Sequence, residues 1–265
     1  GKVRGLVSYY KPPQESKDYP SVSHHKVEVE MSKSQAHFSN LLSKNLGPVL
    51  RWKVENAIPP EKKESAKLNA FLSAARQISN TTEEFDKGFK PDHASKINLV
   101  AKNIKESGGP SIAYSNYLGS GIHPLSKRLT EMGVPHLAFT GEMNDKEKKF
   151  AVGAYNSGKV KAILLSSAGG EGLDLRGTRG IHILEPHWHQ EKINQVVGRG
   201  ARFKSHAHLP ESERNVKVYH YISKLPKKST LFGKKEGVRS ADQYLSEIGK
   251  KKQELNNQFL KALKD

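Results

Sequence analysis

Short apolar runs recur along the middle of the chain, and turn residues separate them from longer amphipathic stretches. Each run has the length of a strand and is rich in the branched side chains that favour a buried, pleated surface. The runs predict strands at Ser111–Ser115, Pro135–Thr140, Val160–Ser167, Gly180–Pro186 and Val216–Ser223.

Helical periodicity fills the intervals between these runs. Ile97, Val100 and Ile104, for example, repeat at the spacing of one helix face. The predicted helices are Ala94–Ser107, Ile122–Met132, a helix capped by Asn144 that reaches Asn156, and Gln190–Arg202. Strands that alternate with helices imply a parallel sheet with right-handed crossovers and helices on both faces. The fold class is therefore α/β.

Both ends of the chain are less regular. Gly5–Tyr10 suits a strand or a helix end, and His25–Met31 alternates like a half-buried strand. Mainly helical appendages are expected, namely Ser32–Lys44 with a Ser32/Gln35 capping box, Ala66–Ser79, and a helix capped by Ser240 that reaches Lys264. We therefore expect an N-terminal lead-in or helical insertion (1–92), an α/β domain (93–225) and a basic C-terminal helical extension (226–265).

Charge changes this picture by pointing to a partner. The 265 residues include 44 Lys+Arg and 27 Asp+Glu, a formal net charge of +17. Such an excess favours a polyanion as partner, with a merely solvated lysine-rich surface as the alternative. The chain has no cysteine, which excludes disulfides and thiolate zinc sites. No apolar run approaches the roughly 20 residues that span a bilayer, so we expect no membrane partner.

The last predicted helix of the middle region carries the sharpest chemistry. On that helix Gln195, Arg199 and Arg202 follow the spacing i, i+4 and i+7 and share one face. Two permanently charged guanidinium forks beside a neutral amide suit a polyphosphate that gains charge in its transition state. A solvated helix face is the simpler alternative for all three residues.

Small polar residues end several predicted strands. A glycine-rich turn, Ala168–Leu175, also follows one of them and allows a ligand to approach the backbone closely. The strand-end residues are Ser115-Asn116, Thr140-Gly141 and Ser166-Ser167. Because the carboxyl ends of parallel strands meet at one edge, such groups can hold phosphates without reading bases. Structural caps at strand ends are the alternative.

These stretches resemble motifs V and VI of superfamily 2 helicases and translocases. The Gln-x-x-Gly-Arg-x-x-Arg pattern is met by Gln195, Gly198, Arg199 and Arg202, and Ser166–Leu175 is similar to motif V. The order of elements over about 93–223 resembles the second RecA-like lobe of that superfamily. Short matches near both termini resemble helicases of nucleocytoplasmic large DNA viruses, and Glu185–His189 looks like a Swi/Snf segment.

The resemblance implies a role for each of these residues. It makes Arg199 and Arg202 arginine fingers on the γ-phosphate of ATP, and it makes Gln195 a nucleotide sensor or a residue that positions water. It places Gly172 and Asp174 near the ribose or the opposite lobe. It assigns phosphate-backbone contacts to Ser115, Asn116, Thr140, Gly141, Ser166 and Ser167.

The resemblance also implies that ATP and Mg²⁺ are bound mainly by an N-terminal RecA-like lobe absent from this chain. Gly153–Val160 has the spacing of a phosphate-binding loop, but Val160 replaces the Ser or Thr that holds magnesium. It also follows a helix and precedes a strand, the reverse of the required context. We therefore expect this chain alone to bind nucleic acid weakly and to hydrolyse essentially no ATP.

Several alternatives stay open at this point. A Swi/Snf-type duplex DNA translocase and a non-enzymatic nucleic-acid-binding scaffold are the rival functions. DNA is favoured over RNA, and the resemblance suggests an intracellular viral protein that acts in the host cytoplasm or is packaged in the virion, with a role in viral transcription. No metal site is expected, because His182, His187, His189, His206 and His208 have no cysteines or paired carboxylates at ligand spacing.

Overall fold

The computed structural model describes residues 8–9, 17–84, 86, 93–166, 172–187, 189–230, 233–235 and 238–263. The chain divides into two compact units. Unit 1 comprises Gly1–Val27, Lys96–Glu185 and Ile193–Tyr221, and unit 2 comprises Glu28–Ser95, Pro186–Lys192 and Ile222–Asp265. Unit 2 therefore combines most of the predicted N-terminal lead-in with the predicted C-terminal extension.

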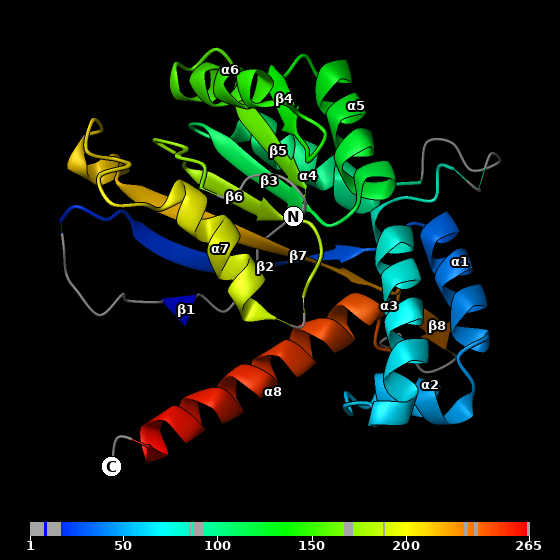
Figure 1. Cartoon of the computed structure of the whole chain (residues 1–265). Helices are drawn as coiled ribbons and strands as arrows, with labels where there is room; N and C mark the ends of the chain where they lie inside the picture. Colours follow the sequence, from blue (N-terminus) through cyan, green and yellow to red (C-terminus); the bar gives the residue numbers. More distant parts are fainter. Residues whose placement is uncertain are drawn as a thin grey trace. The chain divides into compact units, whose positions relative to one another are not determined.

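A seven-stranded sheet with the order β1-β2-β7-β6-β3-β5-β4 is the main feature of the described residues (Figure 1). Its strands are β1 (Ser8–Tyr9), β2 (Ser21–Glu30), β3 (Ser111–Ser115), β4 (His136–Phe139), β5 (Ala162–Ser166), β6 (Gly180–Ile183) and β7 (Asn215–Lys224). The five strands from β7 to β4 are parallel. All five strands predicted in the middle of the chain are confirmed: β3 has the predicted bounds, β4, β5 and β6 are shorter, and β7 is longer by one residue at each end.

The two N-terminal strands extend the sheet. Ser21 N–H donates to Arg214 O and Met31 N–H donates to Lys224 O, so the bonds advance in the same direction and β2 runs parallel to β7. β1 pairs antiparallel with β2. β2 begins at Ser21, four residues before the start expected from the alternation at His25. The first residues of this strand are mostly polar, so their pattern did not predict a strand.

Helices cover both faces of the sheet, as predicted. They are α4 (Ser95–Glu106), α5 (His123–Glu131), α6 (Asp145–Asn156) and α7 (Gln190–Gly200). Asn144 and Glu147 form a capping box at the start of α6. One boundary was wrong: α7 ends at Gly200, so Arg202 lies beyond the helix and does not share a helix face with Gln195 and Arg199.

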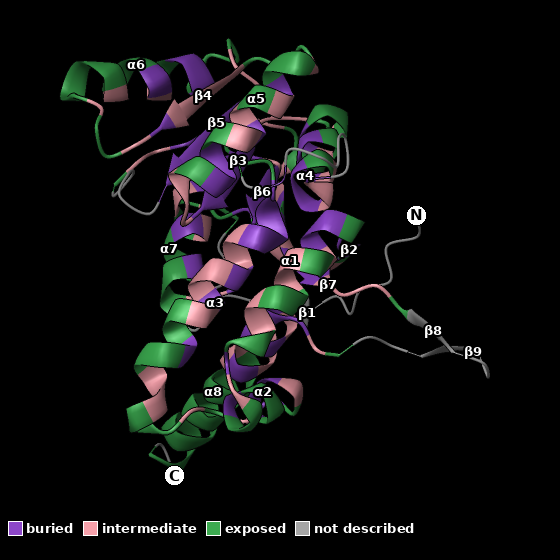
Figure 2. Ribbon diagram, turned by 90° about the vertical axis from the view of Figure 1, so that its right-hand side faces the viewer, coloured by how far each residue is buried: buried purple, intermediate pink, exposed green. Residues whose placement is uncertain are grey.

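Strand alternation decides which side chains meet which helices. Ile112 and Tyr114 of β3 pack in one hydrophobic cluster with Tyr155 of α6 and Val196 of α7. Neighbouring residues in a strand point to opposite faces, so Ala113 and Ser115 face the other side. Figure 2 shows the central strands as buried throughout, and β3, β5 and β6 have no exposed residue.

Unit 2 is mainly helical. Its helices are α1 (Lys33–Lys44), α2 (Pro48–Glu55), α3 (Ser65–Asn80) and α8 (Ala241–Ala262), with a short turn of 3₁₀ helix, η1 (Lys62–Glu64). The capping box predicted at Ser32 is present, and Ser240, predicted as a cap, forms a capping box with Gln243. Leu50, Leu72 and Tyr244 belong to one cluster that joins α2, α3 and α8.

A helix and a pair of short strands in unit 2 were not anticipated. Helix α2 follows Gly47, whose φ of +86° suits glycine, and starts with Pro48 at a position that proline tolerates. β8 (Lys228–Thr230) and β9 (Gly233–Lys235) pair antiparallel within a stretch expected to be a basic loop. These elements are short, and a pattern of three to eight residues gives little periodicity to read.

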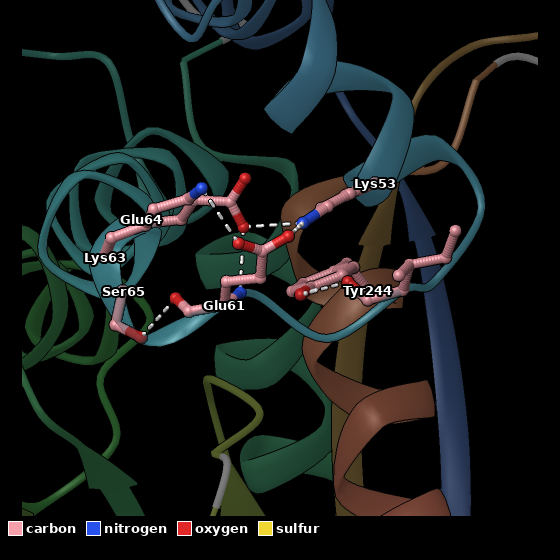
Figure 3. A network of polar contacts seen from close by, with 7 residues as sticks. Lys53, Glu61, Lys63, Glu64, Ser65 and Tyr244 are labelled. Atoms are coloured by element: carbon pink, nitrogen blue, oxygen red, sulfur yellow. Dashed lines mark hydrogen bonds and ion pairs between the residues drawn. The ribbon is translucent and has the colours of Figure 1, made fainter.

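An ion-pair network, buried at Lys53 and exposed at Glu61, joins elements of this helical unit (Figure 3). Lys53 Nζ donates to Glu64 Oε2 at 2.6 Å and to Glu61 Oε1 at 3.4 Å, and the Glu61 backbone N–H donates to Glu64 Oε2 at 2.8 Å. Tyr244 O–H donates to the carbonyl of Ile58 at 2.9 Å, and burial raises the pKa of Tyr244 to about 12. These bonds tie α2, η1 and α8 together.

This network predicts a pH-dependent stability. The Lys53 hydrogen bond holds the pKa of the Glu64 carboxyl below its usual value, with the Glu61 backbone N–H acting in the same direction. A lowered folded-state pKa stabilises the fold above the unfolded value of about 4.3 and ceases to do so as pH falls through the folded value. We expect Glu64→Gln to lower the urea midpoint of unit 2 at neutral pH, with a gap to wild type that narrows below about pH 4.

Glu61→Gln is the matched comparison, because the Glu61 side chain is 60% exposed against 14% for Glu64. It should lower the midpoint less. A Glu64→Gln gap that stayed constant between neutral and acidic pH would show that the charge of Glu64 contributes nothing to folding.

Candidate functional site

Helix α7 brings Arg199 next to a tyrosine of the sheet. Burial raises the pKa of the Tyr114 phenol, Glu185 acts in the same direction, and the Arg199 guanidinium acts in the opposite one. Tyr114 O–H also donates to Asn116 Oδ1 at 3.1 Å, beyond the end of β3. Arg199 is half-buried, whereas Gln195, one turn earlier, is exposed. A positive group therefore lies near the carboxyl end of the central strand.

Arg202 fastens the segment after α7 to the glycine-containing turn before β6. Its Nη1 donates to the carbonyls of Gly172 at 3.3 Å and Leu173 at 3.1 Å. Gly172 has a φ of +75°, which other residues rarely adopt, and open space surrounds its Cα. Arg202 itself is exposed, and no ion pair to it is found among the described residues. One edge of its guanidinium is thus held by the turn.

Two backbone hydrogen bonds strengthen the same connection. Leu175 N–H donates to Arg199 O at 3.3 Å, and Gly177 N–H donates to Ser205 O at 2.9 Å. The sequence placed the two motif-like stretches about one strand apart, and the structure brings them into direct contact. Arginines 199 and 202 and the turn at 172–175 are consequently one structural group.

Asp174 lies in this turn with a partner that sequence reasoning missed. Arg176 Nε donates to Asp174 Oδ2 at 3.0 Å, and the Asp174 side chain is 45% exposed. Asn156 of α6 holds the turn from below, donating to Asp174 O at 2.9 Å and accepting from Arg176 N–H at 2.9 Å. The i, i+2 spacing of Asp174 and Arg176 was the available signal. Asp174 therefore presents a carboxylate that an exposed guanidinium partly neutralises.

The predicted row of strand-end residues forms at the carboxyl edge of the sheet. Ser115 of β3 pairs in register with Ser166 of β5, and Phe139 of β4 pairs with Leu165, so Thr140 follows directly beside them. Ser115 and Ser166 are buried, Asn116 and Thr140 are half-buried, and Gly141 is exposed. The Ser166 hydroxyl has no hydrogen-bond partner within the described part of the chain. Ser167 and the glycines at 169 and 170 lie outside the described residues.

A buried carboxylate that the sequence had not singled out as a site residue organises the end of β3. Ser115 Oγ donates to Glu185 Oε2 at 2.8 Å, and the Asn116 backbone N–H donates to Glu185 Oε1 at 2.7 Å. Lys96 Nζ donates to the carbonyl of the preceding residue, Leu184, at 2.8 Å. Ser115, Lys96 and Glu185 are each at most 1% exposed. The Ser115 hydroxyl is thus committed to Glu185.

The histidines considered as metal ligands are dispersed. Across the part of the chain that the structure describes, no group of three His, Cys, Asp or Glu residues is arranged to hold a metal ion. His182 is buried against Tyr221, with 2.7 Å between Nδ1 and the phenol oxygen, and burial lowers its pKa to about 3. The His206 Nε2 bonds to the carbonyl of Thr178 at 2.6 Å. Both are structural histidines.

Gly200 lets α7 approach the sheet closely. A Cβ at this position would lie 3.0 Å from Ile112 Cδ1 and 3.1 Å from Thr178 Cγ2, whereas a Cβ at Gly198 would meet nothing within 4 Å. We expect Gly200→Val to reduce the free energy of unfolding by about 1–3 kcal/mol through overpacking. Gly198→Val in the same helix should change it by less than about 0.5 kcal/mol. Urea unfolding of both variants measures this, and equal effects would contradict a close contact at Gly200.

Comparison with known protein families gives a match over most of unit 1. Residues 95–204 match the helicase conserved C-terminal domain. This range contains β3, β4, β5, β6 and α7, together with every predicted site residue.

Curated relatives of this chain include proteins of large DNA viruses. The predicted ATP-dependent RNA helicase L538 of Acanthamoeba polyphaga mimivirus is 34% identical over 97% of this chain and 56% of its own length. A termination factor NPH-I homolog of African swine fever virus is 29% identical over 71% of this chain and 34% of its own length. The chain thus spans between about a third and somewhat over half of these two relatives.

Solved structures share the fold at low sequence identity. The C-terminal part of the Fun30 ATPase domain has a TM-score of 0.60 and 14% identity, and the match covers 78% of this chain and 86% of that one. The Sulfolobus solfataricus SWI2/SNF2 ATPase core in complex with dsDNA has a TM-score of 0.55 and 17% identity, over 76% of this chain and 41% of that one. Among the described helices, none combines the length and apolar character needed to cross a membrane.

Proposed function

The chain contains the C-terminal, RecA-like domain of a superfamily 2 helicase or translocase related to helicases of nucleocytoplasmic large DNA viruses, and on this premise we propose that it serves an ATP-driven motor on nucleic acid. In this proposal Arg199 and Arg202 act on the triphosphate of ATP bound chiefly by a separate N-terminal lobe. Gln195 orients the same triphosphate or an attacking water. The relatives' names, an ATP-dependent helicase and a termination factor, support ATP use and a role in viral transcription.

One observation carries the proposal: Arg202 is bonded to the carbonyls of Gly172 and Leu173. The bond fixes one edge of the guanidinium while the residue stays exposed, so the remaining N–H groups are pre-oriented. A planar fork with several donors matches phosphate oxygens, and a pre-organised cation stabilises growing negative charge without rearrangement. Half-buried Arg199 on the adjacent helix end supplies a second cation, and Gly172 and Asp174 present polar groups beside it.

The triphosphate chemistry fits the residues that are present. A ligand at the surface of unit 1 can be reached by Gln195 and Arg202, which are exposed, and by Arg199, which is half-buried. The positive charges of the two arginines suit the negative charge of ATP. Mg²⁺ has no carboxylate cluster to bind among the described residues of this chain. We therefore assign its ligands to the first lobe, where it would neutralise phosphate charge.

For the nucleic-acid strand, we propose phosphate contacts along the carboxyl edge of the sheet. Asn116, Thr140 and the Gly141 backbone are the accessible donors, because they are half-buried or exposed. Ser166 has an unpaired hydroxyl at the same edge within the described residues, and Ser167 follows it directly. Buried Ser115 contributes by holding Glu185, which fixes the loop at Asn116. Contacts of this kind position a strand without reading its sequence.

The test is ATP hydrolysis by the full-length protein in the presence of single-stranded DNA, duplex DNA or RNA. Stimulation by one of these nucleic acids, together with separation of a partial duplex, is expected for a helicase. This 265-residue chain alone should bind the same nucleic acid weakly and show essentially no turnover. A full-length protein that binds nucleic acid but never hydrolyses ATP would establish the scaffold function instead.

A duplex translocase of the Swi/Snf type is the second candidate. Glu185–His189 resembles the Swi/Snf segment, and the structural likeness to the SWI2/SNF2 ATPase core is compatible with it. Duplex-stimulated hydrolysis without strand separation would select this function. Either motor would act inside the infected cell, in the host cytoplasm or from the virion, if the protein is viral like its relatives.

A further inference from the structure

An aromatic pair is exposed immediately after Arg202. Phe203 is 54% exposed and Tyr19 is 47% exposed, and their rings meet edge to face with centroids 5.7 Å apart. Both residues lie in unit 1, although they are far apart in the sequence. Large aromatic rings are among the most strongly apolar groups, so a paired, half-exposed arrangement at a surface suggests a ligand with a flat face.

The chain holds this pair in place by specific bonds. Lys204 N–H donates to Asp18 O at 2.7 Å, which pins the segment before Tyr19 to the segment after Arg202. Lys204 has a φ of +56°, a left-handed conformation that is unfavourable for a residue with a Cβ. Strained backbone persists where the surroundings over-determine it and is concentrated at functional sites. The rings are therefore presented by a fixed scaffold.

The charges around the pair are mostly positive. Lys204 Nζ lies 5.2 Å from the centre of the Phe203 ring. Exposed Arg202 directly precedes Phe203, and exposed Lys17 lies two residues before Tyr19. Asp18 is the acidic residue in these two segments, and its backbone carbonyl accepts the Lys204 bond. An aromatic face flanked by cations is the combination that binds a nucleotide, because the base stacks on the ring through its π-face and the negative phosphate pairs with the cations.

We propose that Phe203, supported by Tyr19 and flanked by Arg202 and Lys204, is a stacking platform for a nucleobase that carries phosphate. This inference rests on the proposed function, because the base belongs either to the nucleic-acid strand or to the ATP on which Arg202 acts. Phe203 directly follows Arg202, so the platform lies next to the arginines proposed to bind phosphate. Unit 1 would then contact the base of the nucleotide as well as its phosphate.

Phe203→Leu tests the platform in the full-length protein, because leucine keeps an apolar side chain but removes the aromatic face. Two quantities are measured: the Kd for fluorescent oligothymidylate without nucleotide, and the KM for ATP at saturating nucleic acid. We expect one of them to rise about tenfold, within the range for losing one stacked base. A rise in the oligothymidylate Kd alone identifies the strand as the source of the base, and a rise in KM alone identifies ATP.

Phe150→Leu is the matched control, since Phe150 is 67% exposed on α6 and has no described ring partner or cation above it. It should change neither quantity. Phe203→Tyr, which keeps an aromatic face, should leave both near their wild-type values, and Tyr19→Leu should give a smaller rise than Phe203→Leu. If Phe203→Leu leaves both quantities at wild-type values, or changes them no more than Phe150→Leu does, the platform is refuted while the motor function stands. If the wild-type protein binds neither oligothymidylate nor ATP, the proposed function itself fails.

Discussion

Arg199→Ala in the full-length protein is expected to lower the kcat of nucleic-acid-stimulated ATP hydrolysis by about 10³–10⁵, the range found where arginine fingers have been isolated. The physical reason is that a pre-positioned guanidinium acts on charge that develops only in the transition state. The KM for ATP should change much less than kcat, because in the proposed motor a separate first lobe supplies most of the ground-state binding of ATP. Steady-state ATPase kinetics at saturating nucleic acid measure both values.

Arg202→Ala should reduce kcat as severely and should add a second effect. Its Nη1 bonds the Gly172 and Leu173 carbonyls, so the alanine variant also loosens the turn that presents Asp174. Arg202→Lys keeps one donor for a carbonyl but loses the planar fork, and it should not restore turnover. Arg51→Ala is the control, because Arg51 is an exposed partner of Glu55 on α2. Wild-type turnover in either variant would show that the replaced arginine does not act on the triphosphate.

Local chemistry made most of the helix starts predictable. Ser32, Asn144 and Ser240 are each the N-cap of a helix. In each case the N-cap side chain accepts from the backbone N–H three residues later, and the side chain of that later residue accepts from the N-cap backbone N–H, so all three are capping boxes. The end of α7 was not predictable in this way. The carbonyl of Arg199 accepts a hydrogen bond from Leu175 N–H, and Gly200 packs against Ile112. These tertiary contacts end the helix before Arg202. Pattern reasoning had no access to either partner.

The sequence indicated which residues belong to the candidate site better than it indicated how those residues contact one another. The motif spacing indicated that Arg199 and Arg202 matter, but not that Arg202 would hold the turn at Gly172. Glu185 could not be recognised as the partner of Ser115, because 70 positions separate them and a lone glutamate after a strand carries no local signal. Phe203 likewise reads as an ordinary apolar residue until Tyr19 is placed beside it.

Glu185 is the residue at which the stability of unit 1 and the proposed contacts with the nucleic-acid phosphates are most closely linked. Replacing it with alanine removes the acceptor of the half-buried Asn116 backbone N–H and leaves the buried Ser115 hydroxyl only the longer bond to the carbonyl of Tyr117, at 3.3 Å. Leaving a buried donor unsatisfied costs about 1–3 kcal/mol, so Glu185→Ala is expected to destabilise unit 1 by about 1–3 kcal/mol, chiefly through the Asn116 backbone N–H. Urea unfolding measures this change in the free energy of unfolding.

The molecules of Glu185→Ala that remain folded should bind nucleic acid more weakly than wild type, because the loop that carries Asn116 loses its hydrogen bond to Glu185. Glu185→Gln separates the two effects, since the amide oxygen still accepts one of the bonds while the negative charge is removed. It should retain more stability than alanine and an intermediate affinity for oligothymidylate. Glu142→Gln is the matched control, because Glu142 is exposed just after Gly141 and should shift stability by less than about 0.5 kcal/mol. If Glu185→Ala were as stable as this control, the carboxylate would not be what holds the end of β3, and the order at Asn116 would have to come from the backbone of the sheet alone.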